Sequence, residues 1–263
     1  MMIGPFEAAL RARRDAGGKI LVPYITGGLG DDWIDILNAV AHAGADGIEI
    51  GIPFSDPVMD GPTIQEANDR SLTGGATPQS ILAAIRDSDL EVPLAVMTYY
   101  NIAFRAGDHR FATDLAEAGV AACILPDLPL EETGSWTEAA DAAGVETILL
   151  AAPTAPDERL PRICERSRGF VYGVGLLGTT GVREALAESA MDIAGRLKAV
   201  TDKPVLVGVG VGTPAQAVQV SEISDGVVVG SAIVNRMLAG AGPDGVGELV
   251  AEFREALDSA YSS

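Results

Sequence analysis

Eight short apolar runs, each followed by a segment of helical periodicity, constrain the fold of this chain most strongly. Such alternation is typical of strands and helices that follow one another along the chain. Several helical segments end at an Ala-Gly pair, as at Ala43-Gly44, Ala118-Gly119 and Ala143-Gly144, and glycine commonly terminates a helix. The expected strands are Ile20–Ile25, Gly47–Gly51, Pro93–Tyr99, Ala121–Pro126, Thr147–Ala151, Phe170–Val174, Val205–Gly208 and Val227–Val229.

The helical segments lie between and after these strands. They are Asp31–Ala43, Thr63–Leu72, Pro78–Asp87, His109–Ala118, Thr133–Ala143, Pro156–Ser167, Arg183–Val200, Thr213–Ser221, Ser231–Leu238 and Glu248–Ser259. Strands separated by helices indicate parallel β–α–β units. Eight such units close into an α/β fold, the (β/α)8 TIM barrel, whose usual length of about 250 residues is close to the 263 of this chain. We therefore expect a single TIM-barrel catalytic domain over residues 1–263.

An open, doubly wound sheet is the competing interpretation of the same alternation. Such a sheet, when it binds a dinucleotide, carries Gly-x-Gly-x-x-Gly after its first strand. This chain has Thr26-Gly27-Gly28-Leu29-Gly30 at that position, and no linker or low-complexity tract marks a second domain. The pattern therefore favours the closed barrel.

Composition narrows the classes of partner. The formal net charge is −19, which argues against nucleic-acid binding because phosphate contacts need clustered Lys and Arg. No apolar run approaches the length that spans a bilayer, and the N-terminus lacks a basic-then-apolar signal. We expect a cytoplasmic protein without a membrane segment. The two cysteines, Cys123 and Cys164, cannot make a disulfide framework.

A carboxylate at the end of the second strand is the strongest candidate for chemistry. In Asp46–Gly51, Glu49 lies between two glycines on an otherwise apolar strand, where burying a charge without a partner is costly. A loop with three prolines follows and carries Asp56 and Asp60; the prolines limit the entropy lost when this loop orders. In a TIM barrel function gathers at the carboxyl ends of strands, so we expect Glu49 to be functional.

Glycines after the last two strands predict a phosphate site. The seventh strand ends in Gly208-Val209-Gly210, and the eighth ends in Gly230-Ser231 before a helix. The loops after strands 7 and 8 commonly bind phosphate in TIM barrels, because glycine lets backbone N–H groups approach an anion at a helix N-terminus. The sequence thus favours a phosphorylated small molecule as substrate.

The few basic residues exclude other mechanisms. The three lysines, Lys19, Lys198 and Lys203, lie before strands or in helices, away from the rim where a Schiff-base lysine is needed. The two histidines, His42 and His109, lie in helical segments, so we expect no metal site. Acid–base catalysis by carboxylates without a metal remains.

Several segments along nearly the whole chain match one known family. They are Pro23-Tyr24-Ile25-Thr26, Glu49–Pro62 with Thr63-Ile64-Gln65, Met97-Thr98-Tyr99-Tyr100-Asn101, Pro126–Glu132, Ala152-Pro153-Thr154, Gly169–Tyr172 and Asp225–Ile233. In these segments the chain resembles the tryptophan synthase alpha chain, and Glu49–Pro62 is the most specific of them. The resemblance implies retro-aldol cleavage of indole-3-glycerol phosphate to indole and glyceraldehyde 3-phosphate.

The resemblance also implies roles for single residues. Glu49 would be the general acid/base, Asp60 would accept a hydrogen bond from the indole N–H, and Tyr172 would help to position Glu49. The implied indole pocket comprises Tyr24, Met97, Tyr99 and Ile124. The implied phosphate site comprises the backbone N–H groups of Gly181, Gly208, Gly210, Gly230 and Ser231.

A partner follows from the same resemblance. Family members bind a beta chain that holds pyridoxal phosphate and condenses indole with serine, so we expect an alpha2beta2 heterotetramer and no cofactor in this chain. Pro53 and Asp56 would face the partner or act in loop closure. The segment Gly175–Gly181 lacks the Ser-Arg pair usual in the family. This difference leaves open a stand-alone lyase that releases free indole, and a non-catalytic activating subunit is a third interpretation.

Overall fold

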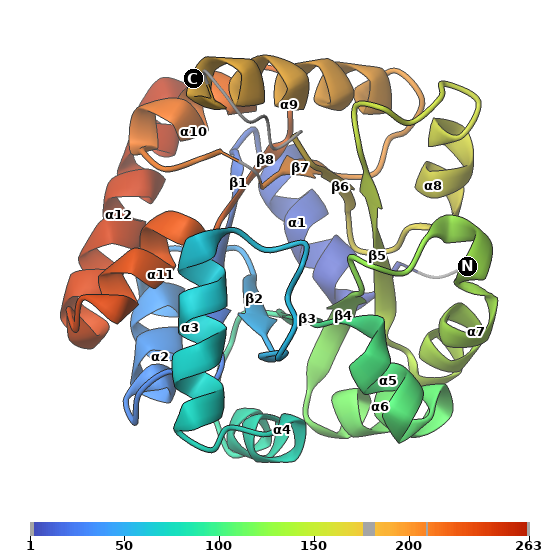
Figure 1. Ribbon diagram of the computed structural model, residues 1–263. Helices are drawn as coiled ribbons and strands as arrows, with labels where there is room; N and C mark the ends of the chain where they lie inside the picture. Colours follow the sequence, from blue (N-terminus) through green and yellow to red (C-terminus); the bar gives the residue numbers. More distant parts are fainter. Residues whose placement is uncertain (1–2, 176–181, 209, 262–263) are drawn as a thin grey trace.

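The computed structural model describes residues 3–175, 182–208 and 210–261. Eight parallel strands form a closed barrel in chain order, and β1 pairs with β8 to complete it (Figure 1). The strands are β1 (Ile20–Thr26), β2 (Ile48–Gly51), β3 (Leu94–Met97), β4 (Val120–Ile124), β5 (Glu146–Ala151), β6 (Val171–Gly173), β7 (Val205–Val207) and β8 (Gly226–Val229). The expected TIM barrel is confirmed, and the open sheet is wrong because β1 and β8 are not edges.

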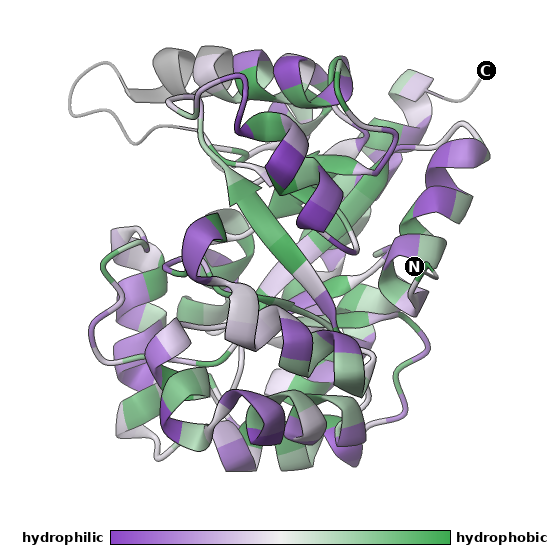
Figure 2. Ribbon diagram, turned by 90° about the vertical axis from the view of Figure 1, so that its right-hand side faces the viewer, coloured by the Kyte–Doolittle hydropathy of each residue, from purple (hydrophilic) through white to green (hydrophobic). Residues whose placement is uncertain are grey.

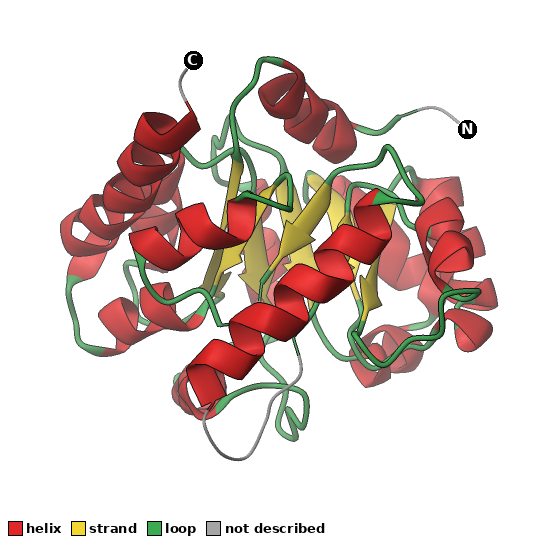
Figure 3. Cartoon of the chain, turned by 90° about the horizontal axis from the view of Figure 1, so that it is seen from above, coloured by secondary structure: helices red, strands yellow, loops and turns green. Residues whose placement is uncertain are grey.

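Helices surround the strands, as the view in Figure 3 shows. They are α1 (Pro5–Asp15), α2 (Trp33–His42), α3 (Pro62–Thr73), α4 (Pro78–Arg86), α5 (Tyr100–Ala106), α6 (Asp108–Glu117), α7 (Gly134–Ala143), α8 (Leu160–Arg166), α9 (Val182–Lys198), α10 (Pro214–Ser221), α11 (Ser231–Leu238) and α12 (Gly242–Tyr261), with a short 3-10 helix η1 (Leu130–Glu132). Among the described residues no helix is long and apolar enough to cross a membrane.

The sequence did not predict α1, α5 or η1. In α1 the apolar signal is short, because Phe6 and Leu10 are its only large buried hydrophobic residues. These two side chains belong to the cluster that fills the barrel interior. Glu146, at the start of β5, accepts hydrogen bonds from the N–H groups of Phe6 at 2.7 Å and Glu7 at 3.1 Å. A buried carboxylate thus holds the first turn of α1 against the end of the barrel opposite the strands' carboxyl ends.

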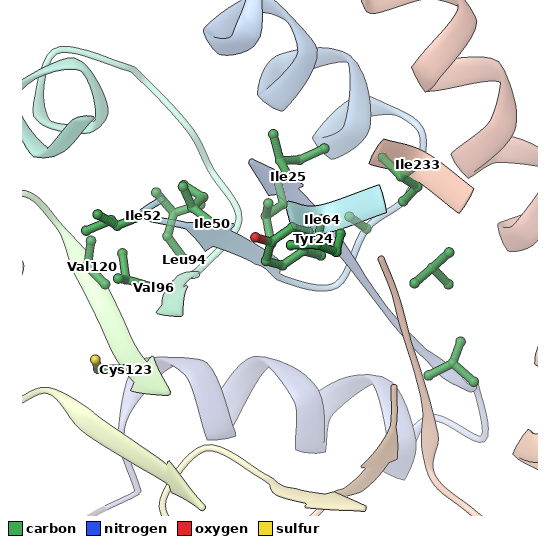
Figure 4. Packing of buried hydrophobic residues seen from close by; sticks show 14 of the residues in the cluster. Tyr24, Ile25, Ile50, Ile52, Ile64, Leu94, Val96, Val120, Cys123 and Ile233 are labelled. Atoms are coloured by element: carbon green, nitrogen blue, oxygen red, sulfur yellow. The ribbon is translucent and has the colours of Figure 1, made fainter. Parts of the chain in front are cut away.

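Apolar side chains form two layers. The inner cluster lies within the barrel and includes Ile20, Val22, Ala95, Ala122, Ile124, Ile148, Phe170, Tyr172, Leu206 and Val228. The outer cluster lies between strands and helices, and Figure 4 shows part of it around Ile25, Ile50 and Val96. Figure 2 shows the corresponding pattern, with hydrophobic strands and hydrophilic outer surfaces on the helices. Because both strand faces are buried, the strands are continuous apolar runs.

The register of β1 to β3 determines what lies beside Glu49. Tyr24 of β1 pairs with Glu49 of β2, and Glu49 pairs with Ala95 of β3. Ala95 pairs in turn with Ala122 of β4. The small alanines leave room inside the barrel on one side of the carboxyl group, and the aromatic ring of Tyr24 borders it on the other.

Candidate active site

Glu49 is a buried carboxyl group inside the barrel. Its exposed fraction is 1%, and its Oε2 atom has no hydrogen-bond partner among the described residues. Burial raises the pKa of Glu49 to about 8, and the nearby charge of Asp60 adds to the rise. A carboxyl group with this pKa carries a proton at neutral pH and can deliver it to a substrate.

Asp60 lies in the loop between β2 and α3, close to Glu49. The hydroxyl of Tyr99 donates a hydrogen bond to its Oδ2 atom at 3.2 Å. Burial raises the pKa of Asp60 to about 6, while the bond from Tyr99 opposes that rise. At neutral pH Asp60 is therefore ionised and Glu49 is neutral, so these two neighbouring carboxyl groups can take different roles.

Two tyrosines lie beside the carboxyl groups, each above a glycine of another strand end. A Cβ atom placed on Gly51 would lie 1.9 Å from the hydroxyl of Tyr24, and one on Gly208 would lie 2.1 Å from the hydroxyl of Tyr172. Burial, chiefly, raises the pKa of both phenols well above the usual value, and the charges of Asp60 and Glu49 contribute. Both hydroxyls thus stay protonated, and the absent side chains at Gly51 and Gly208 make room for them.

Met97 and Ile124 lie next to each other on the inner side of β3 and β4. They are paired in the sheet register, and both contact the inner apolar cluster. Tyr99 follows β3, is 3% exposed, and stacks on Phe54 with ring centroids 5.0 Å apart. The structure thus brings the predicted pocket residues to one rim with Glu49 and Asp60.

The predicted phosphate-binding residues follow adjacent strands. Gly208 and Gly210 follow β7, Gly230 and Ser231 follow β8, and these two strands pair in the barrel. Gly230 precedes α11 and supplies no side chain to cap it, so the first N–H groups of this helix are available to an anion. Gly210 has φ +86°, a conformation that favours glycine. Gly181 lies outside the described residues.

The loop after β2 has a buried start and an exposed middle. Pro53 is buried, whereas Asp56 is exposed and accepts a hydrogen bond from the Ser55 hydroxyl at 2.6 Å. Val58 and Met59 are also exposed, at 81% and 51%. This loop presents apolar surface next to the site.

Asp127 and the lysines make structural contacts. Asp127 accepts a hydrogen bond from the N–H of Tyr100 at 2.8 Å and so holds the first turn of α5. Lys198 pairs with Asp225 at 2.8 Å, while Lys19 and Lys203 donate to backbone carbonyls. The lysine contacts lie at the amino ends of strands, as the sequence predicted, so no lysine described here reaches the carboxyl rim.

Within residues 3–175, 182–208 and 210–261, no group of three or more His, Cys, Asp or Glu side chains could hold a metal ion. A groove of about 600 Å³ lies on the outside of the barrel between α4, α5 and α6. None of the predicted site residues lines this groove.

Comparison with known proteins gives one consistent result. The sequence model described as tryptophan synthase alpha chain matches residues 10–257. The chain belongs to the tryptophan synthase alpha chain family. The alpha chain of Streptomyces coelicolor is 43% identical over 257 residues, covering 95% of this chain and 92% of the relative. That of a Picosynechococcus species is 43% identical over 260 residues, covering 96% and 97%.

Solved structures of the family share the fold. A chain of tryptophan synthase from Mycobacterium tuberculosis has a TM-score of 0.88 at 37% identity, covering 97% of this chain and 99% of that one. The tryptophan synthase alpha subunit of Legionella pneumophila has a TM-score of 0.87 at 32% identity, covering 98% and 100%. Membership confirms the resemblance seen in the sequence, and with it the expectation of a carbon–carbon lyase.

Sequence reasoning missed two parts of the site. Gly51 appeared only as a neighbour of Glu49, and its role in admitting the Tyr24 hydroxyl depends on the pairing of Thr26 with Gly51 across two strands. Phe54 was not singled out, although it stacks on Tyr99. Its place directly after Pro53 in a proline-rich loop was the available signal, since such loops hold their side chains in fixed positions.

Proposed function

We propose that this chain cleaves indole-3-glycerol phosphate to indole and glyceraldehyde 3-phosphate, as one catalytic domain, with Glu49 and Asp60 as its catalytic residues. The observation that carries this proposal is a buried Glu49 carboxyl group, 1% exposed and with no hydrogen-bond partner for Oε2 among the described residues, next to an Asp60 carboxyl group that accepts a hydrogen bond from Tyr99. The pKa values, about 8 for Glu49 and about 6 for Asp60, agree with this arrangement. Retro-aldol cleavage of an indole needs one acid and one anion at neutral pH, and this pair supplies both.

The reaction begins with proton transfer from Glu49 to C3 of the indole ring. The ring then carries positive charge at its nitrogen, and the carboxylate of Asp60 stabilises this charge through the N–H. The Glu49 carboxylate takes the proton of the hydroxyl on the adjacent glycerol carbon, and the C–C bond to C3 breaks. The bond electrons restore the aromatic ring, the carbon becomes an aldehyde, and Glu49 regains its proton.

The remaining residues bind the substrate. Tyr24, Met97, Tyr99 and Ile124 would enclose the indole ring, and Tyr172 would restrict the position of Glu49. The N–H groups at Gly208, Gly210, Gly230 and Ser231 would bind the phosphate, with Gly181 as a further proposed donor. No cofactor takes part in these steps.

We also propose a cytoplasmic alpha2beta2 assembly with a beta chain, in which that partner holds the pyridoxal phosphate and consumes the indole. The solved relatives from Mycobacterium tuberculosis are named tryptophan synthase, without restriction to one subunit. The exposed side chains of Val58 and Met59, beside Pro53 and Asp56, offer an apolar contact surface next to the site.

A stand-alone lyase is the second candidate, because the segment Gly175–Gly181 departs from the family pattern. The non-catalytic activating subunit is disfavoured, since a scaffold would not need a buried Glu49 carboxyl group beside a half-buried Asp60. Indole release from indole-3-glycerol phosphate by the purified chain, with and without a cognate beta chain, separates the three. Weak activity that rises by orders of magnitude with the partner supports the subunit, brisk activity indifferent to it indicates a stand-alone lyase, and no indole under either condition refutes the cleavage reaction.

A further inference from the structure

Tyr99 contacts the loop after β2 at both its start and its end. Its ring stacks on Phe54 with an interplanar angle of 21°. Its hydroxyl accepts a hydrogen bond from the N–H of Met59 at 2.8 Å and donates one to Asp60 at 3.2 Å. The loop from Phe54 to Asp60 is therefore wrapped around one side chain that belongs to a different strand–helix connection.

The direction of these two hydrogen bonds determines where the proton of the Tyr99 hydroxyl points. Because the N–H of Met59 can only donate, the oxygen of Tyr99 accepts there, and its single proton points to the carboxylate of Asp60. A donor fixed in this way favours the ionised carboxylate and holds it in one orientation. The Asp60 carboxylate is thus prepared for the indole N–H before substrate arrives.

We propose that Tyr99 is a positioning residue that orients Asp60 and keeps it ionised, in addition to lining the indole pocket. The inference rests on the proposed function, since it assigns the support of a catalytic carboxylate. Tyr99 acts through Asp60 and transfers no proton to the substrate. It also makes the charge state of Asp60 depend on the conformation of the loop whose middle, at Val58 and Met59, is exposed.

Among the described residues, four titratable groups face Asp60 from the surrounding elements: Tyr99 from the β3–α5 connection, Glu49 from β2, Tyr24 from β1 and Tyr172 from β6. Asp127, which follows β4, faces Tyr99. The phenols stay neutral because burial, above all, raises the pKa of each. Glu49 is also neutral near pH 6, because its pKa is about 8. The acid side of the pH profile therefore reports Asp60 and its bond from Tyr99.

The test compares Tyr99→Phe with Tyr100→Phe. Tyr100 is a matched control, because its hydroxyl donates to Asp108 at 3.3 Å, in α6 rather than in the site. Without the Tyr99 hydroxyl the pKa of Asp60 rises, and we expect the acid limb of kcat/KM to move up by about one pH unit, with roughly a fivefold loss at pH 6 that approaches tenfold at lower pH. The control should keep the wild-type limb. The substrate phosphate titrates equally in all three enzymes, so the difference isolates the protein.

A second substitution moves the same limb in the opposite direction. Replacement of Tyr99 by 3-fluorotyrosine keeps the ring and makes the hydroxyl a stronger donor, so the acid limb should move to lower pH. A purely structural role for Tyr99 would lower the thermal midpoint of Tyr99→Phe and leave both limbs in place. Unmoved limbs in both variants would overturn the inference.

An NMR titration of the Asp60 carboxyl carbon tests the role of Tyr99 without any measurement of enzyme activity. The carbon shift should report a higher pKa in Tyr99→Phe than in the wild type and an unchanged one in Tyr100→Phe. If the wild-type chain released no indole, the proposed function would fail while this titration could still support Tyr99. Equal pKa values in wild type and Tyr99→Phe would reject the role of Tyr99 even in a fully active lyase.

Discussion

A single methyl group at Gly51 is expected to disable the site without touching a carboxyl group. The Cβ atom of Gly51→Ala would lie 1.9 Å from the Tyr24 hydroxyl, and ordinary contact begins at 3.4 Å. The difference, 3.4 − 1.9 = 1.5 Å, is the distance by which the hydroxyl must move away. Tyr24 is buried and paired in register with Glu49. Its ring is therefore displaced next to the Glu49 carboxyl group.

The size of the effect follows from this displacement. Overpacking of a buried side chain costs about 1–3 kcal/mol of stability, and misplacement by about 1 Å in an active site can cost on the order of 100-fold in rate. We expect Gly51→Ala to fold, to unfold at lower urea concentration, and to lose about 10- to 100-fold in kcat/KM for indole release. Tyr24→Phe in the same variant removes the hydroxyl that clashes most and should recover part of the loss.

The matched control is Gly134→Ala at the start of α7. A Cβ atom there meets nothing within 4 Å, so stability and kcat/KM should stay near the wild-type values. The reasoning would be refuted by a Gly51→Ala enzyme whose kcat/KM lies within twofold of wild type. It would also be refuted if Gly134→Ala lost as much activity as Gly51→Ala.

The remaining predictions concern pH and the far end of the barrel. Because Asp60 must be ionised and Glu49 protonated, kcat/KM should fall as pH drops through about 6 and as it rises through about 8; a profile flat from pH 5 to 9 would contradict both assignments. In Asp60→Asn the charge that helps to raise the pKa of Glu49 is gone. The basic limb of the variant's residual kcat/KM profile should therefore move to lower pH. A basic limb that stays in place or moves to higher pH would count against the interaction between Asp60 and Glu49. Glu146→Ala leaves the N–H groups of Phe6 and Glu7 without their acceptor, and urea unfolding should show a loss of about 2–4 kcal/mol with kcat of the folded enzyme unchanged; a loss below about 0.5 kcal/mol would show that α1 does not depend on this carboxylate.

The sequence predicted the barrel and Glu49 because both leave local signals, whereas the role of Asp60 came only from the family resemblance. Buried parallel strands are continuous apolar runs, and a glutamate between glycines interrupts one of them at Glu49. By contrast, α1 buries only two large hydrophobic side chains, too few for a clear helical period. Its stability depends on Glu146, which is about 140 residues away in the sequence and leaves no local pattern.

Contacts between side chains of different strands could not be predicted either, because the partner residues are distant in the sequence and leave no local pattern. The fit of Tyr24 over Gly51, and of Tyr172 over Gly208, depends on sheet register, which adjacent residues do not encode. The hydrogen bond from Tyr99 to Asp60 joins two connections that become neighbours when β2 pairs with β3. The bond from the N–H of Tyr100 to Asp127 likewise joins the connections that follow β3 and β4.

Glu49→Gln tests the central claim most directly, because glutamine keeps the shape of the buried side chain and cannot transfer the proton. The measurement is indole release by this variant with a cognate beta chain present, beside binding of an indolylalkyl phosphate that has no glycerol hydroxyls and cannot be cleaved. We predict that the analogue binds with wild-type affinity while indole release falls at least about 1,000-fold, a loss within the range expected for an acid that acts twice in one turnover. Indole release within tenfold of wild type, with the analogue bound normally, would contradict the assignment of Glu49 as the proton donor.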